Sequence, residues 1–549
     1  MATKAKANKN NFRIAVIDAE TDPFKYGRVP QPFAWGFFDG EIYEEFWGDD
    51  CTDHLLAYLE AYPEPLIIYA HNGGKFDFFY LVEKGAVNNP IMIINGRLTK
   101  VGLGKHELRD SFSIIPVGLA KIGNKEKIEY EKFERTVREK HKKNILHYLA
   151  VDCQELYKVV KAFIDRFGPM LTVGGTAIKE LDKLHPIERG NESHDARFRP
   201  FYFGGRVSTF APGIHEGDFK VYDVNSMYPH VMRNFKHPRG QKFLEFNNPT
   251  IDKLGNLEGY RNRPYFAVIE AENNSALPVR TPDGLNFDIP YGTFYACSHE
   301  VRVALKHKLI KILNVKTAMM PMGIISFDAF VDKFIAEKIQ GQVSKDIVMT
   351  MFAKFMLNSA YGKFGQNPDN YFDYYIKRAD EKIPSRDWQL FIDYGYWEIW
   401  RKPSPKPRYF DVAIAASITS ASRAVLLDAL QSATSPMYCD TDSIICENLS
   451  GQRIDDTALG AWKCEAEGDR LGIAGKKLYA LYDGNECVKY GSKGADLDPA
   501  DIFELARGKV IRSERMNPTF KLGQSFAEMM LPTPSGLRGF VARDIRRTA

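Results

Sequence analysis

Two aspartates stand one residue apart inside an apolar stretch, and this setting restricts the fold more than any other feature of the sequence. They are Asp440 and Asp442 in YCDTDS, with Met437 before them and Ile444 and Ile445 after them. Charged groups are costly to place among apolar neighbours unless something pairs with them. A surface turn could carry such a pair, but the flanking residues are typical of a buried strand. We therefore expect a core that brings positive charge to this point.

A third aspartate ends another apolar strand. Asp223 lies in FKVYDVNSMYPHVM (219–232), a pattern that predicts a strand followed by a helix. Buried aspartates placed together repel each other and raise the pKa of one of them. Bound Mg²⁺ would remove that conflict, because hard cations prefer oxygen ligands. The sequence thus predicts a metal site that contains Asp223, Asp440 and Asp442.

A second set of acids lies in the first third of the chain. Asp18 and Glu20 are two residues apart at the end of a predicted strand, so their side chains share one face. Asp77 follows a pair of glycines, and Tyr148 and Asp152 are neighbours on one face of a predicted helix. Each piece alone is common as a strand end or a surface pair. Together they predict a second site, because two divalent ions need about this many carboxylates.

A helix predicted near residues 330–364 carries an unusual stripe. Lys354, Asn358 and Tyr361 fall at positions i, i+4 and i+7, so they line one face. The edge of an amphipathic helix is the alternative interpretation. A cation, an amide and an aromatic ring suit a nucleotide, because lysine binds phosphate as a point charge.

Length and composition give broad limits on the number of domains, the cellular compartment and the kind of partner. A chain of 549 residues is too long for one core, so we expect three or more lobes with strands and helices in mixed order. The seven scattered cysteines indicate a reducing compartment. The lysine-containing start lacks a signal-peptide pattern, and no run of 18 apolar residues predicts a membrane span. The net charge of +4 is uninformative, but the basic end of the chain (505–549) suits a phosphate backbone.

Taken in order, these motifs resemble those of family B DNA polymerases with an attached 3′–5′ exonuclease. YDVNSMYP, KFMLNSAYG and YCDTDS resemble the three polymerase motifs, and DAE (18–20), NGGKFD (72–77) and YLAVD (148–152) resemble the three exonuclease motifs. YFGG (202–205) is similar to the linker motif between the two domains, and KLY (477–479) to the motif that holds the primer. The set resembles the motifs of the protein-primed branch found in phages. The sequences of the exonuclease segments most resemble those of the tectivirus type.

The resemblance implies a role for each matching residue. Asp223, Asp442 and the carbonyl group of Val224 would bind two Mg²⁺ (or Mn²⁺) ions with Asp440 nearby, and Asp18, Glu20, Asp77 and Asp152 would bind two more, with Tyr148 orienting water. The nucleotide would contact Tyr228, Lys354, Asn358 and Tyr361. Residues that match primer or single-strand contacts are Tyr202, Gly204, Gly205, Lys477, Tyr479, Thr21, Tyr69, His71, Asn72, Phe76, Ser111 and Phe112, and Lys125 matches a catalytic lysine loosely.

Two departures from the family pattern leave roles open. Related enzymes carry further lysines before the motif lysine, where this chain has Thr350, and Lys345 would lie about 180° away on a continuous helix. The second cation for the triphosphate is therefore unassigned. TSASR (419–423) has Ser422 where the family's primer motif has glycine.

The resemblance also implies the architecture: an α+β multidomain chain with an RNase H-like exonuclease domain followed by a right-hand polymerase domain with two insertions. The expected segments are a basic disordered tail (1–12), the exonuclease domain (13–185), palm (186–234), a first insertion that contacts terminal protein or DNA (235–329), fingers (330–368), a second insertion for strand displacement (369–410), palm (411–504) and thumb (505–549).

The expected activity is protein-primed replication of linear phage DNA with proofreading. The implied partners are a terminal protein, template-primer DNA, deoxynucleoside triphosphates and a single-stranded DNA-binding protein. We expect a monomer in the host cytoplasm. A self-priming relative and a DNA-binding relative without catalysis are the alternatives, and the intact carboxylate sets argue against the second.

Overall fold

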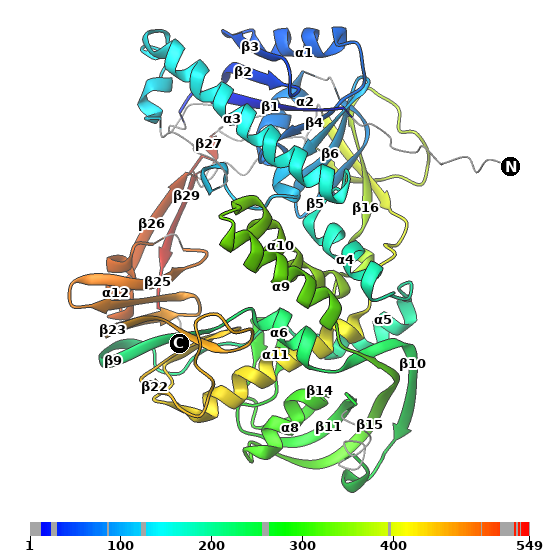
Figure 1. Cartoon of the computed structure of the whole chain (residues 1–549), viewed down its shortest axis with the longest axis vertical. Coiled ribbons are helices and arrows are strands. Elements are labelled where there is room, and N and C mark those ends of the chain that lie inside the picture. Colours follow the sequence, from blue (N-terminus) through cyan, green and yellow to red (C-terminus); the bar gives the residue numbers. More distant parts are fainter. Residues whose placement is uncertain are drawn as a thin grey trace, which may run out of the picture.

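The computed structural model describes residues 13–23, 30–84, 87–121, 128–254, 263–393, 397–495, 497–516, 532–533, 536–537 and 540–547. The predicted basic tail (1–12) and Lys125 lie outside these residues, as does much of the basic C-terminal segment. Figure 1 shows the N-terminal sheet at the top, two helices in the middle, and two further sheets below them. Strands and helices occur in mixed order, as the sequence predicted.

The N-terminal part is a sheet covered by helices on both faces. Alternate residues of β1 (Ile14–Thr21) enter different cores, with Val16 facing α3 (Arg138–Phe167) and Ile17 the other side. The remaining elements are β2 (Pro32–Phe38), β3 (Tyr43–Trp47), α1 (Cys51–Ala61), β4 (Ile67–Ala70), α2 (Asp77–Glu83), β5 (Val87–Ile94), β6 (Arg97–Leu103) and β7 (His106–Asp110). The predicted strand that carries Asp18 and Glu20 and the predicted helix that carries Tyr148 and Asp152 are both present.

The segment predicted as a second insertion extends this N-terminal sheet. It forms a β-ribbon from β16 (Phe372–Arg378), β17 (Gln389–Asp393) and β18 (Trp397–Pro403). Tyr374 of β16 pairs with Ile91 of β5, giving one ten-stranded sheet. Ile376 and Ile399 share a core with Ile91. Segments about 280 residues apart in the sequence are thus held in one sheet.

A seven-stranded sheet lies in the lower half of Figure 1. Its order is β25-β24-β23-β9-β21-β20-β8. The strands are β8 (Val207–Thr209), β9 (Gly213–Val224), β20 (Tyr438–Asp440), β21 (Ser443–Cys446), β23 (Trp462–Gly475), β24 (Leu478–Asp483) and β25 (Glu486–Ser492). The β9 strand leads into α6 (Met227–Asn234), as the sequence predicted.

Helix α11 (Val412–Ser432) packs behind this sheet. It contacts α6 and α8 (Ser298–Lys306) and, among the described residues, is the one helix long and apolar enough to pass a length test for a membrane span. Because 89% of its apolar window is buried inside the protein, α11 is a core helix.

Residues 237–325 contain a separate four-stranded sheet with its own core. The order is β10-β15-β11-β14, and its strands are β10 (His237–Asn247), β11 (Phe266–Asn273), β14 (Tyr291–Cys297) and β15 (Ile310–Ile325). A short hairpin, β12 (Val279–Thr281) and β13 (Gly284–Asn286), lies between β11 and β14 in sequence.

Two helices occupy the middle of the molecule, where we predicted one continuous helical pattern. They are α9 (Asp328–Val343) and α10 (Ile347–Phe364). Lys345 has a positive φ of 57° and Asp346 caps α10 by accepting a hydrogen bond from the backbone N–H of Met349. The prediction that Lys345 lies on a continuous helix is therefore wrong, and it lies in the connection between the two helices.

Helix α10 joins the N-terminal and C-terminal halves of the chain. It packs on α4 (Val173–Leu184), and Phe352 contacts Phe163 and Phe167 of α3 at ring-centroid distances of 5.4 and 5.9 Å. Helix α5 (Glu192–Phe198) follows α4. One hydrophobic core thus runs from the N-terminal sheet through α10 to β9 and β21.

The C-terminal elements are α12 (Pro499–Ala506), β26 (Ile511–Met516), β27 (Pro532–Thr533), β28 (Gly536–Leu537) and β29 (Phe540–Ile545). Helix α12 begins at a capping Asp498 followed by Pro499, a favoured helix start. The predicted palm–thumb boundary at 504/505 therefore falls inside a helix and needs to move to a position outside α12.

Candidate active sites

The pairing of β9 with β21 brings the predicted catalytic acids together. Asp223 lies opposite Ser443, and the backbone N–H of Val224 donates to the carbonyl of Asp442 at 2.9 Å. Asp440 ends β20, and Thr441 turns the chain with a positive φ of 60°. This tight turn places Asp442 beside Asp223, at the ends of two interior strands of the sheet.

The charges of these acids oppose one another. Burial, followed by the charge of Asp442, raises the pKa of Asp223 to about 7. Burial, followed by the charge of Asp440, raises the pKa of Asp442 to about 6. Glu465 on β23 adds to both shifts, and the sequence motifs did not indicate it. Such crowded carboxylates provide the hard oxygen ligands that Mg²⁺ or Mn²⁺ prefers.

Lys477 pairs with the third acid of this site. Its Nζ lies 2.6 and 2.8 Å from the two carboxylate oxygens of Asp440, and its backbone N–H donates to the hydroxyl of Tyr438. The ring of Tyr479 packs against Tyr438 at 5.1 Å. The KLY segment is therefore built into the acidic site, and Lys477 supplies the positive charge that the apolar setting of Asp440 required.

Two tyrosines close the space above these acids. The rings of Tyr228 on α6 and Tyr361 on α10 stack at a centroid distance of 3.8 Å and an angle of 11°. At this separation the two rings are in direct contact, so no base can lie between them. Lys354 and Asn358 are exposed on the same face of α10, as the predicted stripe requires.

A second lysine approaches Lys354 from the neighbouring helix. Burial and the charge of Lys354 lower the pKa of Lys338 on α9. The sequence could not indicate Lys338, because its position relative to Lys354 depends on how α9 packs against α10.

The YFGG segment touches both the acidic turn and α10. A Cβ atom at Gly205 would lie 2.7 Å from the Oγ1 atom of Thr441, and one at Gly365 would lie 2.5 Å from the Tyr202 ring. Buried Arg423 donates to the carbonyls of Phe203 and Gly204 and forms an ion pair of 2.7 Å with Glu300. Arg423 of TSASR thus holds the backbone of the YFGG segment in place.

The second predicted acidic cluster also forms. Ligand oxygens of Asp18, Glu20 and Asp152 lie within 4.8 Å of one another. Asp77 begins α2 and is buried, and its pKa is raised by burial and then by the charge of Asp18. Tyr148 lies one turn before Asp152 on α3. Four carboxylates from three elements therefore converge, a donor set suited to divalent cations.

Residues predicted to contact single-stranded DNA lie beside this cluster. The two ring nitrogens of His71 lie 3.0 Å from the Oγ atom of Ser111 and 2.9 Å from the carbonyl oxygen of Val117. Arg97, which no motif indicated, donates to Asn72 and to Asp110. Its guanidinium lies 4.6 Å from the centre of the Phe112 ring.

Some of the predicted contact residues do not reach the surface. Tyr69 is 1% exposed and packs in the core, and Ser111 is 0% exposed. Ser111 contacts His71 and donates to the carbonyl of Ala70. Direct DNA contact by Tyr69 and Ser111 is therefore not supported, and Ser111 instead contacts His71 from inside the protein. Thr21 is also buried, whereas Phe76 and Phe112 are half-buried.

Comparisons with known proteins agree with this geometry. Residues 122–445 match the family described as DNA polymerase type B, organellar and viral. The DNA-directed DNA polymerase of Enterobacteria phage PRD1 is 46% identical over 499 residues, covering 90% of this chain and 87% of that protein. A DNA polymerase of Bacillus phage Nf is 26% identical over 294 residues, covering 48% of this chain and 45% of that protein.

Solved structures support the fold. The Phi29 DNA polymerase complexed with primer-template DNA and incoming nucleotide has a TM-score of 0.71 at 17% identity, covering 97% of this chain and 100% of that chain. The same enzyme complexed with single-stranded DNA has a TM-score of 0.70 at 18% identity, covering 98% and 100%. The predicted arrangement of an exonuclease-type domain followed by a right-hand polymerase fold is confirmed.

Proposed function

The chain belongs to the organellar and viral type B DNA polymerases, and from this premise we propose that it extends DNA at the Asp223–Asp442 site and removes 3′-terminal nucleotides at the Asp18 cluster. The observation that carries the proposal is the β9–β21 register, which brings Asp223 and Asp442 side by side with raised pKa values. Their mutual repulsion favours binding of divalent cations.

The carboxylates of Asp223 and Asp442 and the carbonyl of Val224 would hold Mg²⁺ or Mn²⁺, two ions per site. Such ions activate an attacking hydroxyl group or water and neutralise the charge on the leaving group. The residues of this chain position the reactants. Lys477 pairs with Asp440 and fixes the orientation of its carboxylate, and Tyr479 packs where a primer terminus would arrive.

The incoming nucleotide would lie between α10 and the acids. Lys354 and Lys338 would contact its triphosphate, and the electrostatic interaction between the two lysines supports Lys338 as the second cation. Admission of the base requires Tyr228 and Tyr361 to separate, because their rings are in contact. Tyr228 would then lie under the sugar, where its ring would clash with a 2′-hydroxyl group.

Proofreading would use the N-terminal cluster. Asp18, Glu20, Asp77 and Asp152 would hold the ions, and Tyr148 would orient the attacking water. Arg97 would fix Asn72 and Phe112 so that they grip the unpaired 3′ end. Aromatic rings bind single strands without sequence preference, because every base has a face on which to stack.

We further propose protein priming and strand displacement, in the host cytoplasm during phage DNA replication. A terminal-protein hydroxyl group can replace the 3′-hydroxyl in the same chemistry. The four-stranded sheet of residues 237–325 is the proposed contact for that protein. The ribbon β16–β18 is joined to β5 and would enclose the template beside the exonuclease-type domain. The segments proposed from the sequence keep their roles, with the thumb starting after α12.

One experiment separates the two proposed activities. The double variant Asp440→Ala, Asp442→Ala should lose nucleotide incorporation and keep degradation of single-stranded DNA. Undiminished incorporation would overturn the assignment. Incorporation on a linear template with and without a terminal protein then tests priming, and synthesis that needs no such protein would favour the self-priming alternative.

A further inference from the structure

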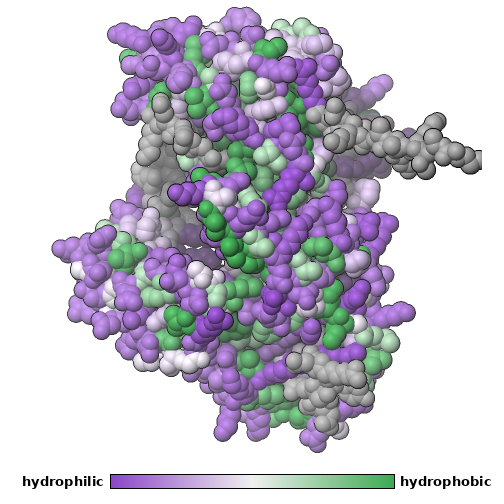
Figure 2. Space-filling view, viewed as in Figure 1, coloured by the Kyte–Doolittle hydropathy of each residue, from purple (hydrophilic) through white to green (hydrophobic). Residues whose placement is uncertain are grey.

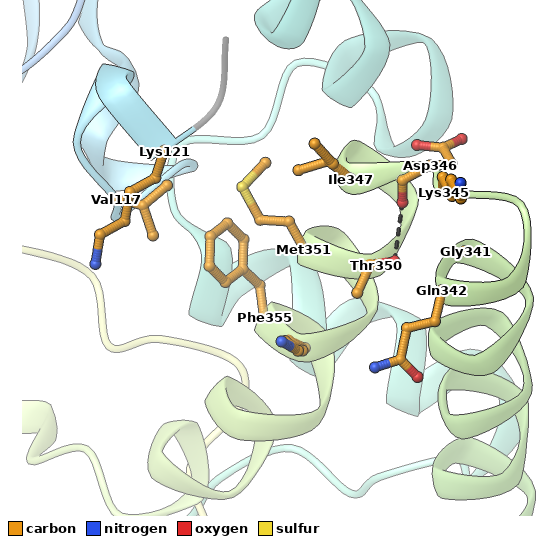
Figure 3. A pocket seen from close by; sticks show the side chains of 11 residues that line it. Val117, Lys121, Gly341, Gln342, Lys345, Asp346, Ile347, Thr350, Met351 and Phe355 are labelled. Carbon is orange, nitrogen blue, oxygen red and sulfur yellow. Dashed lines mark hydrogen bonds between the residues drawn. The ribbon is translucent and has the colours of Figure 1, made fainter. Parts of the chain in front are cut away.

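A cavity of about 430 Å³ lies between the fingers helices and the N-terminal domain. We call it the fingers-tip pocket, and Lys121, Lys345, Ile347, Met351, Lys354 and Phe355 are among its lining residues. Figure 3 shows Met351 and Phe355 pointing from α10 toward Val117 and Lys121. In Figure 2 hydrophobic residues gather near the centre of the visible face, where Figure 1 draws α9 and α10. The volume falls in the range of pockets that hold small organic ligands.

The lining combines apolar surface with positive charge. Ile347, Met351 and Phe355 provide an apolar wall, and Ile347 is 63% exposed. Three lysines, Lys121, Lys345 and Lys354, stand around it. Asp346 is the acid among the lining residues, and its side chain caps α10. An apolar body with a strongly anionic group fits this combination, and a nucleoside triphosphate has both.

The pocket adjoins the proposed site of nucleotide insertion. Ile347, Lys354 and Asn358 are exposed on one side of α10 at helical spacing, and Met351, which is 9% exposed, lines the pocket between Ile347 and Lys354. One face of α10 therefore runs from the pocket to the nucleotide stripe. Lys354 belongs to both. The stacked rings of Tyr228 and Tyr361 meanwhile occupy the position that the base would enter.

We propose that the fingers-tip pocket holds a deoxynucleoside triphosphate before insertion. The base packs on Met351 and Phe355, and the triphosphate lies among Lys121, Lys345 and Lys354. When the two tyrosines separate, Lys354 keeps its hold on the phosphates while the base moves along α10. This inference rests on the proposed polymerase function, because the pocket supplies nucleotide to the Asp223–Asp442 site.

A fluorescent deoxyadenosine triphosphate titrated into the full-length protein without DNA tests the pocket directly. The double variant Lys121→Ala, Phe355→Ala should bind this probe about tenfold more weakly, since base–aromatic stacking and a phosphate contact each contribute appreciably to affinity. The KM for the nucleotide should rise by a similar factor while kcat stays close to the wild-type value. Lys158→Ala, which removes an exposed lysine on α3, is the matched control and should bind normally.

Three outcomes would decide the matter. Unchanged probe affinity and KM in the double variant would overturn the proposal. Weaker binding of template-primer DNA with unchanged probe affinity would also overturn it and indicate that a DNA strand occupies the pocket. Because Lys121 is an exposed residue, the single variant Lys121→Ala repeats the test without risk to folding. If the wild type binds the probe but incorporates no nucleotide, the polymerase proposal fails and the pocket stands.

Discussion

The ammonium group of Lys477 lies 2.6 Å from a carboxylate oxygen of Asp440, at the same end of the sheet as Asp223 and Asp442. This pair explains how two aspartates can be placed one residue apart between apolar neighbours. Lys477 balances the charge of Asp440, so the unbalanced charges are those of Asp223 and Asp442. The KLY segment therefore helps to build the acidic site.

Removing this lysine should impair synthesis and spare degradation. Lys477→Met leaves Asp440 without its partner, and a hydrogen bond to a charged group contributes about 1.5–3 kcal/mol, or about 10- to 100-fold in rate. We expect kcat/KM for primer extension to fall by that factor. Degradation of single-stranded DNA should not change. Lys476→Met, one residue earlier and exposed, is the control, and an equal loss in both variants would contradict the role of the Lys477–Asp440 pair.

The Tyr228 ring should set the choice of sugar. Tyr228→Ala removes the ring that would clash with a 2′-hydroxyl group, and forcing an extra group into a packed site typically costs about 1–3 kcal/mol. The ratio of ribonucleotide to deoxyribonucleotide incorporation should therefore rise by about 10- to 100-fold. Tyr361→Phe keeps the stacking ring and should leave that ratio unchanged. An unaltered ratio in Tyr228→Ala would refute this role.

Arg423 should matter for stability. Arg423→Ala leaves Glu300 buried without a partner and leaves two carbonyls of the YFGG segment without donors. Breaking a buried ion pair typically costs about 3–5 kcal/mol, and denaturant unfolding should show a loss of this size. Lys311→Ala removes an exposed ion pair with Glu272 and should change the free energy of unfolding by less than about 1 kcal/mol.

Two buried histidines should make the protein sensitive to acid. His237 and His299 both approach the hydroxyl of Ser417, and burial lowers the pKa of His237 to about 4 and that of His299 well below its ordinary value. Both are neutral when folded, whereas in the unfolded chain they take up protons below about pH 6.5. Stability should therefore decrease as the pH falls from 7 to 4, by up to about 3 kcal/mol for His237 alone.

The slope of stability against pH is the quantity to measure. His237→Gln should reduce this slope even if the variant is less stable at pH 7. His54→Gln changes an exposed histidine on α1 and should leave the slope as it is. Equal slopes in the wild type and His237→Gln would contradict the assignment.

Local patterns predicted much of the fold because the hydrophobic periodicity was strong. The strand β1 and the helix α3 follow from short stretches. The stretch around Asp440 and Asp442 was predicted as a buried strand, and it forms two strands, β20 and β21, with a turn at Thr441 between them. The break between α9 and α10 does not follow from hydrophobic periodicity, because it depends on the side chain of Asp346, which caps the start of α10. The pairing of β16 with β5 joins distant segments, and no local pattern indicates such a contact.

The acids of both sites could be predicted for a similar reason. Asp18, Glu20, Asp223 and Asp440 lie near the ends of apolar strands, where charges stand out in a sequence. Asp77 and Asp152 lie on helices, and the order of the motifs and their family resemblance joined them to Asp18 and Glu20. Lys338, Glu465 and Arg97 could not be found in this way, because each belongs to its site through tertiary packing. Tyr69 and Ser111 match motif positions, but both side chains are buried. A motif match does not show whether a side chain reaches the surface.

The central claim is that two separate acidic clusters bind divalent cations. Anomalous diffraction from crystals soaked in Mn²⁺ tests this most directly, with Asp223→Asn and Asp152→Asn as paired variants. We predict Mn²⁺ between Asp223 and Asp442 and again among Asp18, Glu20, Asp77 and Asp152, each variant losing the signal at its own cluster alone. Absence of Mn²⁺ between Asp223 and Asp442 in the wild type, with template-primer DNA and nucleotide bound, would contradict the account.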